Sequence, residues 1–213
     1  MSTYYNIHTH QAKKAPEIIS VTSYSVDDKQ INTESYFSIG IHPWFIKDPE
    51  SQLDKLKSYL NHPNLVAIGE CGLDMLEGND LEKQIMVFKG QVELSELHQK
   101  PLIIHCVKGY HILLELKKEL NPEQPWIVHG FNGKPELAIQ LTQQNISLSL
   151  GISWLKKPDH FNKLSESIPE QRIFFETDEA PVDDIKKIYS LAATFNPGLY
   201  DVINHNVKKV FKI

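Results

Sequence analysis

Cysteine is scarce in this chain of 213 residues, long apolar runs are missing, and there is no surplus of basic residues. The two cysteines, Cys71 and Cys106, are too few for a disulfide framework, which excludes the small disulfide-stapled folds. No apolar run approaches the roughly 20 residues that cross a bilayer, so we expect no membrane association. The first residues lack a charged segment followed by an apolar one. We therefore expect no signal peptide, a cytoplasmic location and reduced thiols.

The net charge of −5 is unlike that of a protein that grips a long duplex through a basic stripe. If the substrate is a nucleic acid, the sequence favours a short contact near the reacting end. Bound metal ions would then supply much of the local positive charge. The length, together with a hydrophobic content of 41%, predicts one domain spanning residues 1–213 with an ordinary buried core.

Short apolar segments alternate with segments of helical periodicity along most of the chain. Several of the apolar segments lack strict alternation, as strands buried on both faces do. The predicted strands are 4–8, 17–22, 36–40, 65–69, 102–105, 126–129, 146–150 and 173–176. The predicted helices are 50–60, 81–99, 110–120, 134–144, 156–168, 183–194 and 199–210, with a turn at Pro197-Gly198 between the last two.

The alternation of strands and helices predicts an α/β fold with a parallel sheet. Eight such strands indicate a closed (β/α)8 TIM-type barrel. The first two connections are unusual, because residues 10–16 are few for a parallel return and residues 23–35 have the character of a loop. We expect these two crossovers to be short or irregular, without regular helices.

Potential metal ligands follow the predicted strands. His8 and His10 lie two residues apart at the end of the first strand, so both side chains point to one side of it. Other histidines and acidic residues stand at or just beyond the C-terminal ends of later strands, which meet at one mouth in a parallel barrel. These residues are His42, Glu70, His105, His129 and Asp178.

Six of these side chains make a ligand set larger than one tetrahedral ion needs. The set is His8, His10, Glu70, His105, His129 and Asp178. Four imidazoles and two carboxylates suit two divalent ions with one carboxylate bridging, and imidazole favours zinc, manganese, iron or nickel over a pure magnesium cage. Such a pair activates water and stabilises both the attacking and the departing oxygen. The chemistry suits hydrolysis of phosphoesters, amides or lactones.

The motifs, taken in order, resemble those of the TatD-related metal-dependent hydrolases. They are Asn6-Ile7-His8-Thr9-His10, Gly40-Ile41-His42-Pro43, Ile68-Gly69-Glu70-Cys71-Gly72-Leu73-Asp74, Pro101-Leu102-Ile103-Ile104-His105, His129-Gly130-Phe131, Glu176-Thr177-Asp178 and the tail 206–211. The resemblance runs from the first strand to the last helix and implies a barrel similar to the amidohydrolases. It also implies a deoxyribonuclease that acts on DNA ends or strands with Mg²⁺ or another divalent cation, so that Mg, Mn and Zn are the expected metals.

Carried onto this sequence, the resemblance assigns a role to each residue. It implies one ion at His8, His10, Glu70 and Asp178, and a second ion at Glu70, His105 and His129, with Glu70 bridging. It implies that Asp178 also accepts a proton from the attacking water. His42 would contact substrate rather than metal. Lys108 would take the place of a phosphate-binding arginine, and Asn6 stands where the family usually has aspartate.

The sequence is compatible with three functions. The leading one is a divalent-metal-dependent deoxyribonuclease that cleaves phosphodiester bonds, with Asp178 and Glu70 as catalytic residues and His42, Lys108 and Trp44 contacting substrate. The second is an amidohydrolase or lactonase acting on a small molecule, which the net negative charge favours. The third is a catalytically degenerate barrel that binds without turnover. Trp44 suits stacking on a base, although a large aromatic residue near a barrel mouth is more often a lid or the edge of a core.

Overall fold

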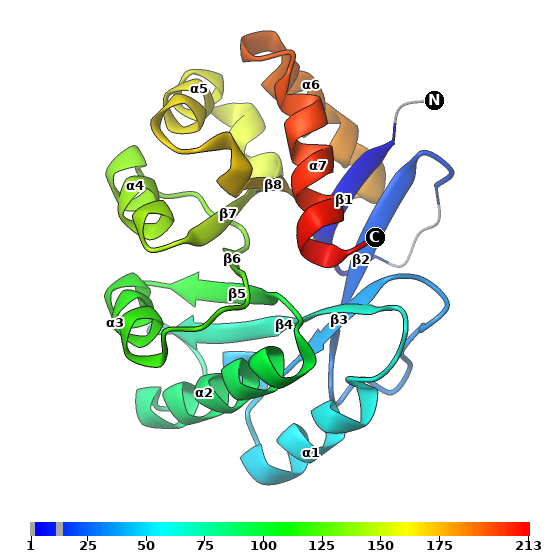
Figure 1. The fold of residues 1–213 in the computed structure, drawn as a ribbon, viewed down its shortest axis with the longest axis vertical. Helices are drawn as coiled ribbons and strands as arrows, with labels where there is room; N and C mark the ends of the chain where they lie inside the picture. Colours follow the sequence, from blue (N-terminus) through cyan, green and yellow to red (C-terminus); the bar gives the residue numbers. More distant parts are fainter. Residues whose placement is uncertain (1–2, 12–14) are drawn as a thin grey trace. The chain divides into compact units, whose positions relative to one another are not determined.

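The chain forms a single parallel sheet of eight strands in chain order, with helices between the later strands (Figure 1). In the computed structural model, which describes residues 3–11 and 15–213, the pairs β1–β2, β3–β4, β4–β5 and β7–β8 are all parallel. A bridge between Thr9 and Asp178 also joins the first strand to the segment after the last. This strand order is that of a (β/α)8 barrel, so the predicted fold class is confirmed. The strands are β1 (Tyr4–Thr9), β2 (Ile18–Ser25), β3 (Phe37–Gly40), β4 (Leu65–Asp74), β5 (Leu102–Val107), β6 (Trp126–Val128), β7 (Ile146–Leu150) and β8 (Ile173–Phe175).

The α-helices of the described residues begin and end within two residues of their predicted bounds. Capping explains some of this agreement, because Asp48 and Asp80 accept hydrogen bonds from the first turns of α1 and α2. The helices are α1 (Pro49–Tyr59), α2 (Leu81–His98), α3 (Tyr110–Leu120), α4 (Pro135–Gln143), α5 (Pro158–Ser167), α6 (Ile185–Phe195) and α7 (Leu199–Phe211). Short 3-10 helices occur at η1 (Pro43–Phe45), η2 (Ile152–Lys156), η3 (Glu170–Arg172) and η4 (Val182–Asp184).

The first two connections carry no regular helix in their described parts, as predicted. Residues 10–11 and 15–17 between β1 and β2 are bends, turns and a single bridge, and residues 12–14 lie outside the described residues. Residues 26–36 between β2 and β3 are turns and irregular backbone. The first helix on a strand connection is η1, which follows β3 directly.

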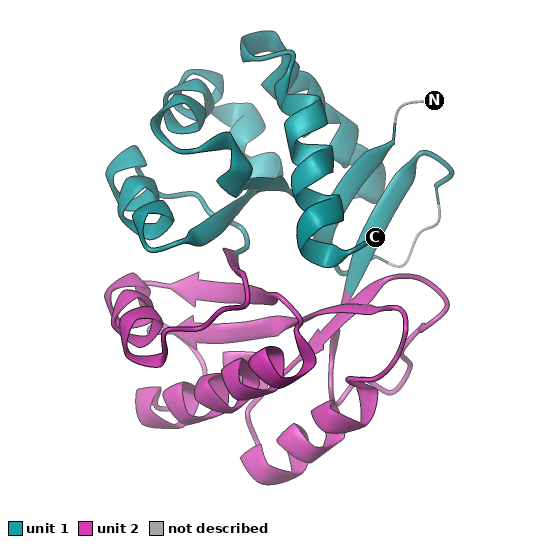
Figure 2. Cartoon of the chain, in the orientation of Figure 1, with its two compact units in different colours: residues 1–22, 128–213 teal, residues 23–127 magenta. Residues whose placement is uncertain are grey.

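Two compact units divide the chain (Figure 2). Residues 1–22 and 128–213 form unit 1, and residues 23–127 form unit 2, so that the boundaries fall inside β2 and β6. In unit 1, α6 and α7 pack on β1, and α4 packs on β7. In unit 2, α2 packs on β4, α1 on β3 and α3 on β5. Each unit therefore buries its own strands under its own helices.

Strand β4 differs most from its prediction, because it continues five residues beyond the expected end, from 69 to 74. Gly69 and Gly72 lie within it with φ angles of +144° and +138°, which only glycine adopts readily. Their missing side chains let β5 approach closely. The register with β5 shifts between Ile68 and Cys71, as at a β-bulge, and Glu70 lies inside this shift.

Both cysteines are buried free thiols, as expected from the sequence. Burial raises the pKa of Cys106 to about 12 and that of Cys71 still further. Such thiols are poor nucleophiles and poor metal ligands, so Cys71 and Cys106 act as small apolar core residues. Within the described residues, no helix has both the length and the apolar character that a membrane span requires.

Candidate metal centre

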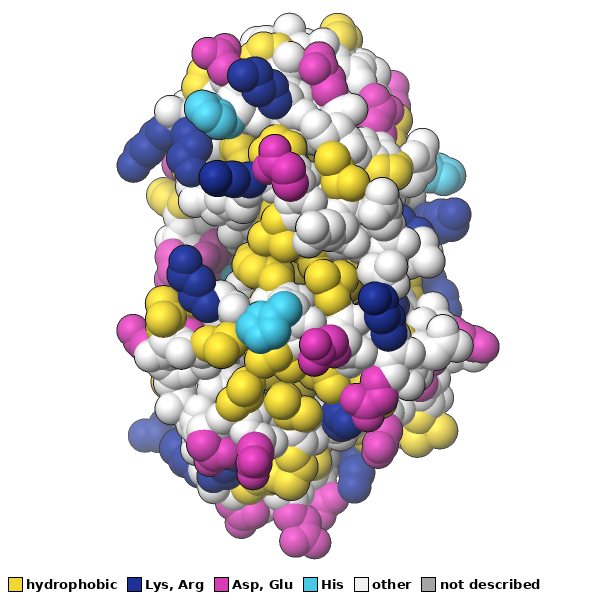
Figure 3. Space-filling model, turned by 90° about the vertical axis from the view of Figure 1, so that its left-hand side faces the viewer, with side chains coloured by type: hydrophobic (Ala, Val, Ile, Leu, Met, Phe, Trp, Pro, Cys, Tyr) yellow, Lys and Arg dark blue, Asp and Glu magenta, His cyan; other side chains and the backbone are white. Residues whose placement is uncertain are grey.

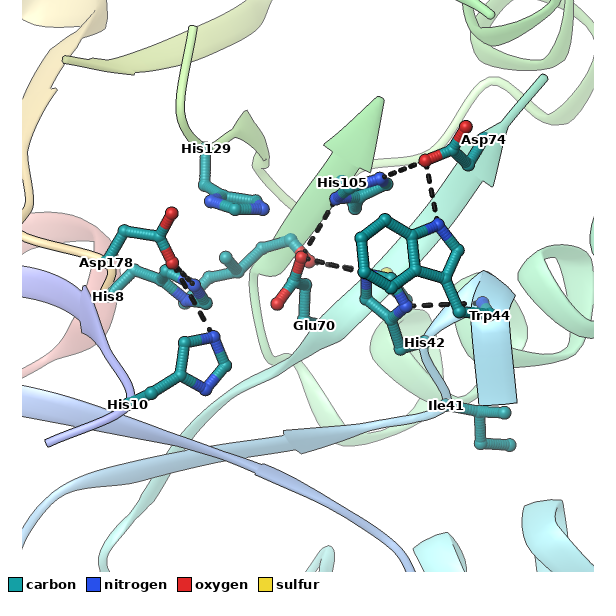
Figure 4. A network of polar contacts seen from close by, with 12 residues as sticks. His8, His10, Ile41, His42, Trp44, Glu70, Asp74, His105, His129 and Asp178 are labelled. Atoms are coloured by element: carbon teal, nitrogen blue, oxygen red, sulfur yellow. Dashed lines mark hydrogen bonds and ion pairs between the residues drawn. The ribbon is translucent and has the colours of Figure 1, made fainter. Parts of the chain in front are cut away.

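Unit 1 gathers His8, His10 and Asp178, which we call the unit 1 cluster (Figure 4). The two histidines point the same way from β1, as their spacing predicted. Asp178 Oδ1 lies 3.5 Å from His8 Nε2 and 3.6 Å from His10 Nε2. His8 is fully buried, whereas His10 and Asp178 are partly exposed. The cluster is therefore anchored in the core on one side and accessible on the other.

Backbone contacts between β1 and the segment after β8 fix the position of Asp178. Its N–H donates to the His8 carbonyl at 3.0 Å, and its own carbonyl accepts from the His10 N–H at 3.2 Å. Asp178 has a φ of +54°, an uncommon conformation that Asp tolerates better than most residues. The two backbone hydrogen bonds hold this turn and aim the carboxylate at both imidazoles.

His129, directly after β6, lies next to the unit 1 cluster, with its ring 4.2 Å from that of His8. Behind it, Glu176 Oε1 lies 3.5 Å from His129 Nδ1 and accepts a 2.6 Å hydrogen bond from the Gly130 N–H. Glu176 is fully buried. A carboxylate behind the far nitrogen of a histidine is the arrangement that orients metal-binding imidazoles.

Asn6, which stands where the resemblance predicts aspartate, exchanges two hydrogen bonds with Thr177. Asn6 Nδ2 donates to Thr177 Oγ1 at 2.8 Å, and the Thr177 N–H donates to Asn6 Oδ1 at 3.1 Å. Both residues are buried. Asn6 therefore holds the segment that carries Asp178, and the amide does this without a charge.

We expect Asn6→Ala to lower the free energy of unfolding by about 1–3 kcal/mol, because it removes two buried hydrogen bonds and leaves the Thr177 N–H with only its longer, 3.3 Å bond to the His8 carbonyl. Asn6→Asp should lose less, since a carboxylate still accepts from that N–H and the Thr177 hydroxyl can turn to donate. Denaturant unfolding of the two variants and the wild type measures both effects. Equal losses in the two variants would show that this pair does not hold the Asp178 segment.

Unit 2 gathers His42, Glu70 and His105, which we call the unit 2 cluster (Figure 4). Glu70 comes from the bulge of β4, His42 follows β3, and His105 lies in β5. Glu70 Oε1 lies 3.1 Å from His42 Nε2 and 3.0 Å from His105 Nδ1. All three side chains are largely buried, with exposed fractions of 10 to 13%.

Each histidine of the unit 2 cluster is oriented through its other ring nitrogen. His42 Nδ1 accepts from the Trp44 N–H at 3.2 Å, which places the proton on Nε2, where it is donated to Glu70. His105 Nε2 lies 2.9 Å from Asp74 Oδ2. The His105–Asp74 pair repeats the carboxylate-behind-histidine arrangement of unit 1.

Asp74 is buried, and yet its pKa lies below the ordinary aspartate value. Burial alone would raise the pKa. Hydrogen bonds from His105, the Leu76 N–H, Trp44 Nε1 and the Glu77 N–H outweigh that effect. Asp74 is therefore a carboxylate at neutral pH and a firm acceptor for the His105 ring.

The donor atoms of the unit 1 cluster suit a divalent cation. In the unit 1 cluster the nitrogen–oxygen separations of 3.5 and 3.6 Å are too long for good hydrogen bonds. Two ligands each about 2.1 Å from a tetrahedral ion lie roughly 3.4 Å apart, which these separations approach. Imidazole with carboxylate is a ligand type that zinc and manganese accept. The residues present therefore fit a metal-binding role.

The structure brings together most of the predicted site residues within their own units. His8, His10, His129 and Asp178 are close in unit 1, and His42, Glu70 and His105 are close in unit 2 with Trp44 against them. Lys108 follows β5 with a φ of +58° and an exposed side chain.

The sequence analysis did not predict two carboxylates of the site, Asp74 and Glu176. Asp74 could have been found from its position, because Glu70, Gly72 and Asp74 alternate along one strand and share a face. That signal required β4 to be predicted beyond residue 69. Glu176 was placed in a predicted strand, but nothing in its spacing marks it as the partner of His129.

A (β/α)8 chain with histidine–carboxylate clusters at its strand ends belongs to the metal-binding barrels as a class. Within that class, this chain belongs to the TatD related DNase family, whose model matches residues 11–212.

The relatives and solved structures that resemble the chain agree with this family. A metal-dependent hydrolase of Buchnera aphidicola is 33% identical over 69% of this chain and 57% of its own length. The 3'-5' ssDNA/RNA exonuclease TatD of Erwinia tasmaniensis is 29% identical over 65% of this chain and 56% of its own length. The chain thus spans little more than half the length of these two relatives. YjjV, a TatD homologue of Escherichia coli, has the same fold, with a TM-score of 0.84 at 18% identity over 99% of this chain and 98% of its own.

Proposed function

We propose that the chain is a divalent-metal-dependent hydrolase that cleaves phosphodiester bonds in single-stranded DNA or RNA. The observation that carries the proposal is the pair of histidine–carboxylate clusters. The unit 1 cluster has separations close to those of metal ligands, and the unit 2 cluster is backed by the buried Asp74. The TatD exonuclease resembled by this chain acts on ssDNA and RNA, and the Buchnera relative is a metal-dependent hydrolase. The name of the TatD exonuclease supports a single-stranded nucleic acid as the substrate, and the name of the Buchnera relative supports metal-dependent hydrolysis as the reaction.

The proposal uses two divalent cations, with Mg, Mn or Zn as candidates. Following the family resemblance, His8, His10, Glu70 and Asp178 would hold one cation, and Glu70, His105 and His129 the other. When bound, the cations supply Lewis acidity and an activated water. Asp178 is partly exposed and would accept the proton of the attacking water. His42 and Lys108 would contact a phosphate oxygen, and Trp44 would contact a base.

We also propose that the chain works as one domain, because β2 and β6 each belong to both compact units. The free, buried state of both cysteines supports a reducing compartment such as the cytoplasm.

A small-molecule amidohydrolase or lactonase is the second candidate. On the face drawn in Figure 3, acidic side chains stand among the basic ones. With the net charge of −5, this distribution offers little general attraction to long nucleic acid. This distribution of charge is compatible with a short contact at the end of a nucleic-acid strand, and also with an uncharged small substrate.

A substrate panel separates these candidates. The purified chain, supplied with Mg²⁺, Mn²⁺ or Zn²⁺, is assayed on single-stranded DNA and RNA oligonucleotides, an aryl phosphodiester, a lactone and an amide. We expect metal-dependent hydrolysis of the phosphodiesters and none of the lactone or amide. The reverse pattern would favour the amidohydrolase candidate, and binding of metal without any turnover would indicate a degenerate barrel.

Removing the metal should abolish hydrolysis and also lower thermal stability. A ligand present at 100 times its Kd stabilises the folded state by about 2.7 kcal/mol. For a chain of this size that corresponds to a fall in Tm of roughly 5–10 °C on chelation. Differential scanning calorimetry with and without EDTA measures the shift, and adding metal back should restore both Tm and activity. Undiminished hydrolysis in EDTA would refute the proposal.

A further inference from the structure

Exposed large apolar side chains concentrate beside the unit 2 cluster. Trp44 and Phe45 in η1 are 41% and 52% exposed, and Met75 and Leu76, directly after β4, are 45% and 68% exposed. We call these four residues the shelf. Only three other large apolar side chains of the described residues are comparably exposed, and they lie on α2 and α6. Such a concentration on one side of a polar cluster indicates a binding surface.

The two segments of the shelf are held together by a side-chain hydrogen bond and by close packing of their backbones. Asn79 Nδ2 donates to the Ile46 carbonyl at 2.9 Å, which joins the loop after β4 to the end of η1. Gly78 lies so close to Pro43 that an added Cβ would sit 2.7 Å from the Pro43 carbonyl oxygen. The shelf is therefore built by two loops that pack on each other. Residues 74–81 and Gln84 also line a cavity of about 280 Å³, close to the lower end of the range for small-ligand sites.

Trp44 is fixed against the two histidines of the unit 2 cluster. Its ring centroid lies 4.9 Å from that of His42 and 5.6 Å from that of His105, both in edge-to-face geometry (Figure 4). Its Nε1–H donates to Asp74 Oδ2 at 2.8 Å. Since the polar edge of the indole is engaged by protein, its exposed part offers an apolar, aromatic surface.

One oxygen atom links the shelf to the unit 2 cluster. Asp74 Oδ2 lies 2.8 Å from Trp44 Nε1 and 2.9 Å from His105 Nε2. The other oxygen, Oδ1, accepts from the N–H groups of Leu76 and Glu77 at 2.8 and 3.0 Å. A single buried carboxylate thus sets the position of Trp44, of the Leu76 loop and of the His105 ring. These four donors stabilise its charge and fix its orientation.

We propose that the shelf binds an unpaired nucleobase next to the scissile phosphodiester. We also propose that Asp74 is the positioning residue that fixes the Trp44 ring relative to the His105 ring. The proposal rests on the function proposed above and deepens it. An aromatic face offers every base a stacking surface without reading sequence. A base in a duplex is already stacked and paired, so the shelf selects single strands or unpaired ends.

Tryptophan fluorescence tests the stacking directly and needs no turnover. Of the three tryptophans, Trp126 and Trp154 are 0% and 2% exposed, so Trp44 alone is accessible to a ligand. The full chain in EDTA is titrated with a thymidine oligonucleotide, with an abasic strand of equal length and with a blunt duplex. We expect saturable quenching by the oligonucleotide, and none or much less by the abasic strand and the duplex. Equal responses to all three ligands would overturn the stacking role.

Variants then test the shelf by the Kd of a labelled oligonucleotide, measured by anisotropy in EDTA. We expect Trp44→Leu, which keeps an apolar side chain, to weaken binding about tenfold. Phe195→Leu is the matched control, because Phe195 is a 39% exposed aromatic residue on α6 in unit 1. It should bind as the wild type does. Equal Kd values for Trp44→Leu and the wild type would contradict the proposal.

A double-mutant cycle tests the positioning role of Asp74. Asparagine can offer its one oxygen either to the Trp44 and His105 donors or to the two loop N–H groups, but not to both pairs. We expect Asp74→Asn to weaken binding several-fold in the wild type and to add little in Trp44→Leu. Independent, additive effects would show that Asp74 does not act through Trp44. Single-strand binding without hydrolysis would leave the shelf intact and refute the hydrolase instead.

Discussion

Glu70→Gln is expected to reduce hydrolysis at least roughly a thousandfold, well beyond the 10–100-fold that loss of an outer partner of a metal ligand costs. Glutamine keeps the size of the side chain and one oxygen. It removes the charge that would hold a cation, and it places an amide where His42 and His105 now meet Oε1. Initial rates on a single-stranded oligonucleotide at saturating metal measure the loss.

The control for this variant is Glu93→Gln, an exposed glutamate on α2 in the same unit. It changes the net charge of the chain equally and should retain the wild-type rate. Thermal unfolding of both variants in EDTA shows whether the fold is kept. A folded Glu70→Gln variant with near wild-type hydrolysis would exclude Glu70 from the metal centre.

Gly72→Ala is expected to have the largest effect on stability, a loss of roughly 3–5 kcal/mol. The φ of +138° is strained for any side chain, and an added Cβ would lie 2.0 Å from the carbonyl oxygen of His105. That oxygen belongs to the paired backbone of β5 and cannot move aside without breaking the sheet. The expected fall in Tm is roughly 10 °C or more.

Gly90→Ala provides the matched control. Gly90 lies inside α2, and an added Cβ there would meet only the ends of the half-buried Leu53 side chain, at 3.0 and 3.2 Å. Replacing a helical glycine with alanine gains about 0.5–1 kcal/mol, which offsets the small movement of Leu53. Its Tm should stay near the wild-type value. A Tm of Gly72→Ala equal to that of Gly90→Ala would show that β4 does not need glycine at this position.

The order of strands and helices was predictable because each element carries a strong local signal. Buried strands such as β7 (Ile146–Leu150) are short apolar runs, and α3 (Tyr110–Leu120) has helical periodicity over its full length. The metal-ligand candidates were predictable for a related reason. Topology places them at strand ends, so locating the strands located His8, His10 and Asp178 as well.

The rest depends on contacts that local sequence does not encode. The extension of β4 to Asp74 arises because β5 packs against Gly69 and Gly72, which is a property of the partner strand. The pairing of Glu176 with His129 joins residues that are 47 positions apart in the chain, from 129 to 176. The two-way pairing of Asn6 with Thr177 likewise spans the chain and shows how an uncharged residue can serve at that position.

A carboxylate behind a histidine occurs in both units. Asp74 stands behind His105, and Glu176 behind His129. Each is fully or almost fully buried. Asp74 also accepts from the N–H groups of Leu76 and Glu77, and Glu176 accepts from the Gly130 N–H. His105, which Asp74 holds at hydrogen-bond distance, is oriented before any ion arrives, which lowers the cost of binding one.

Metal content per chain is the measurement that tests the account most directly. The wild type and the Asp178→Ala and Glu70→Ala variants are loaded with Zn²⁺ or Mn²⁺, desalted and analysed for bound metal by elemental analysis, with hydrolysis measured on the same samples. We expect close to two ions per wild-type chain, fewer in both variants, and activity that follows the metal content. Wild-type chains that retain no metal and still hydrolyse substrate would contradict it.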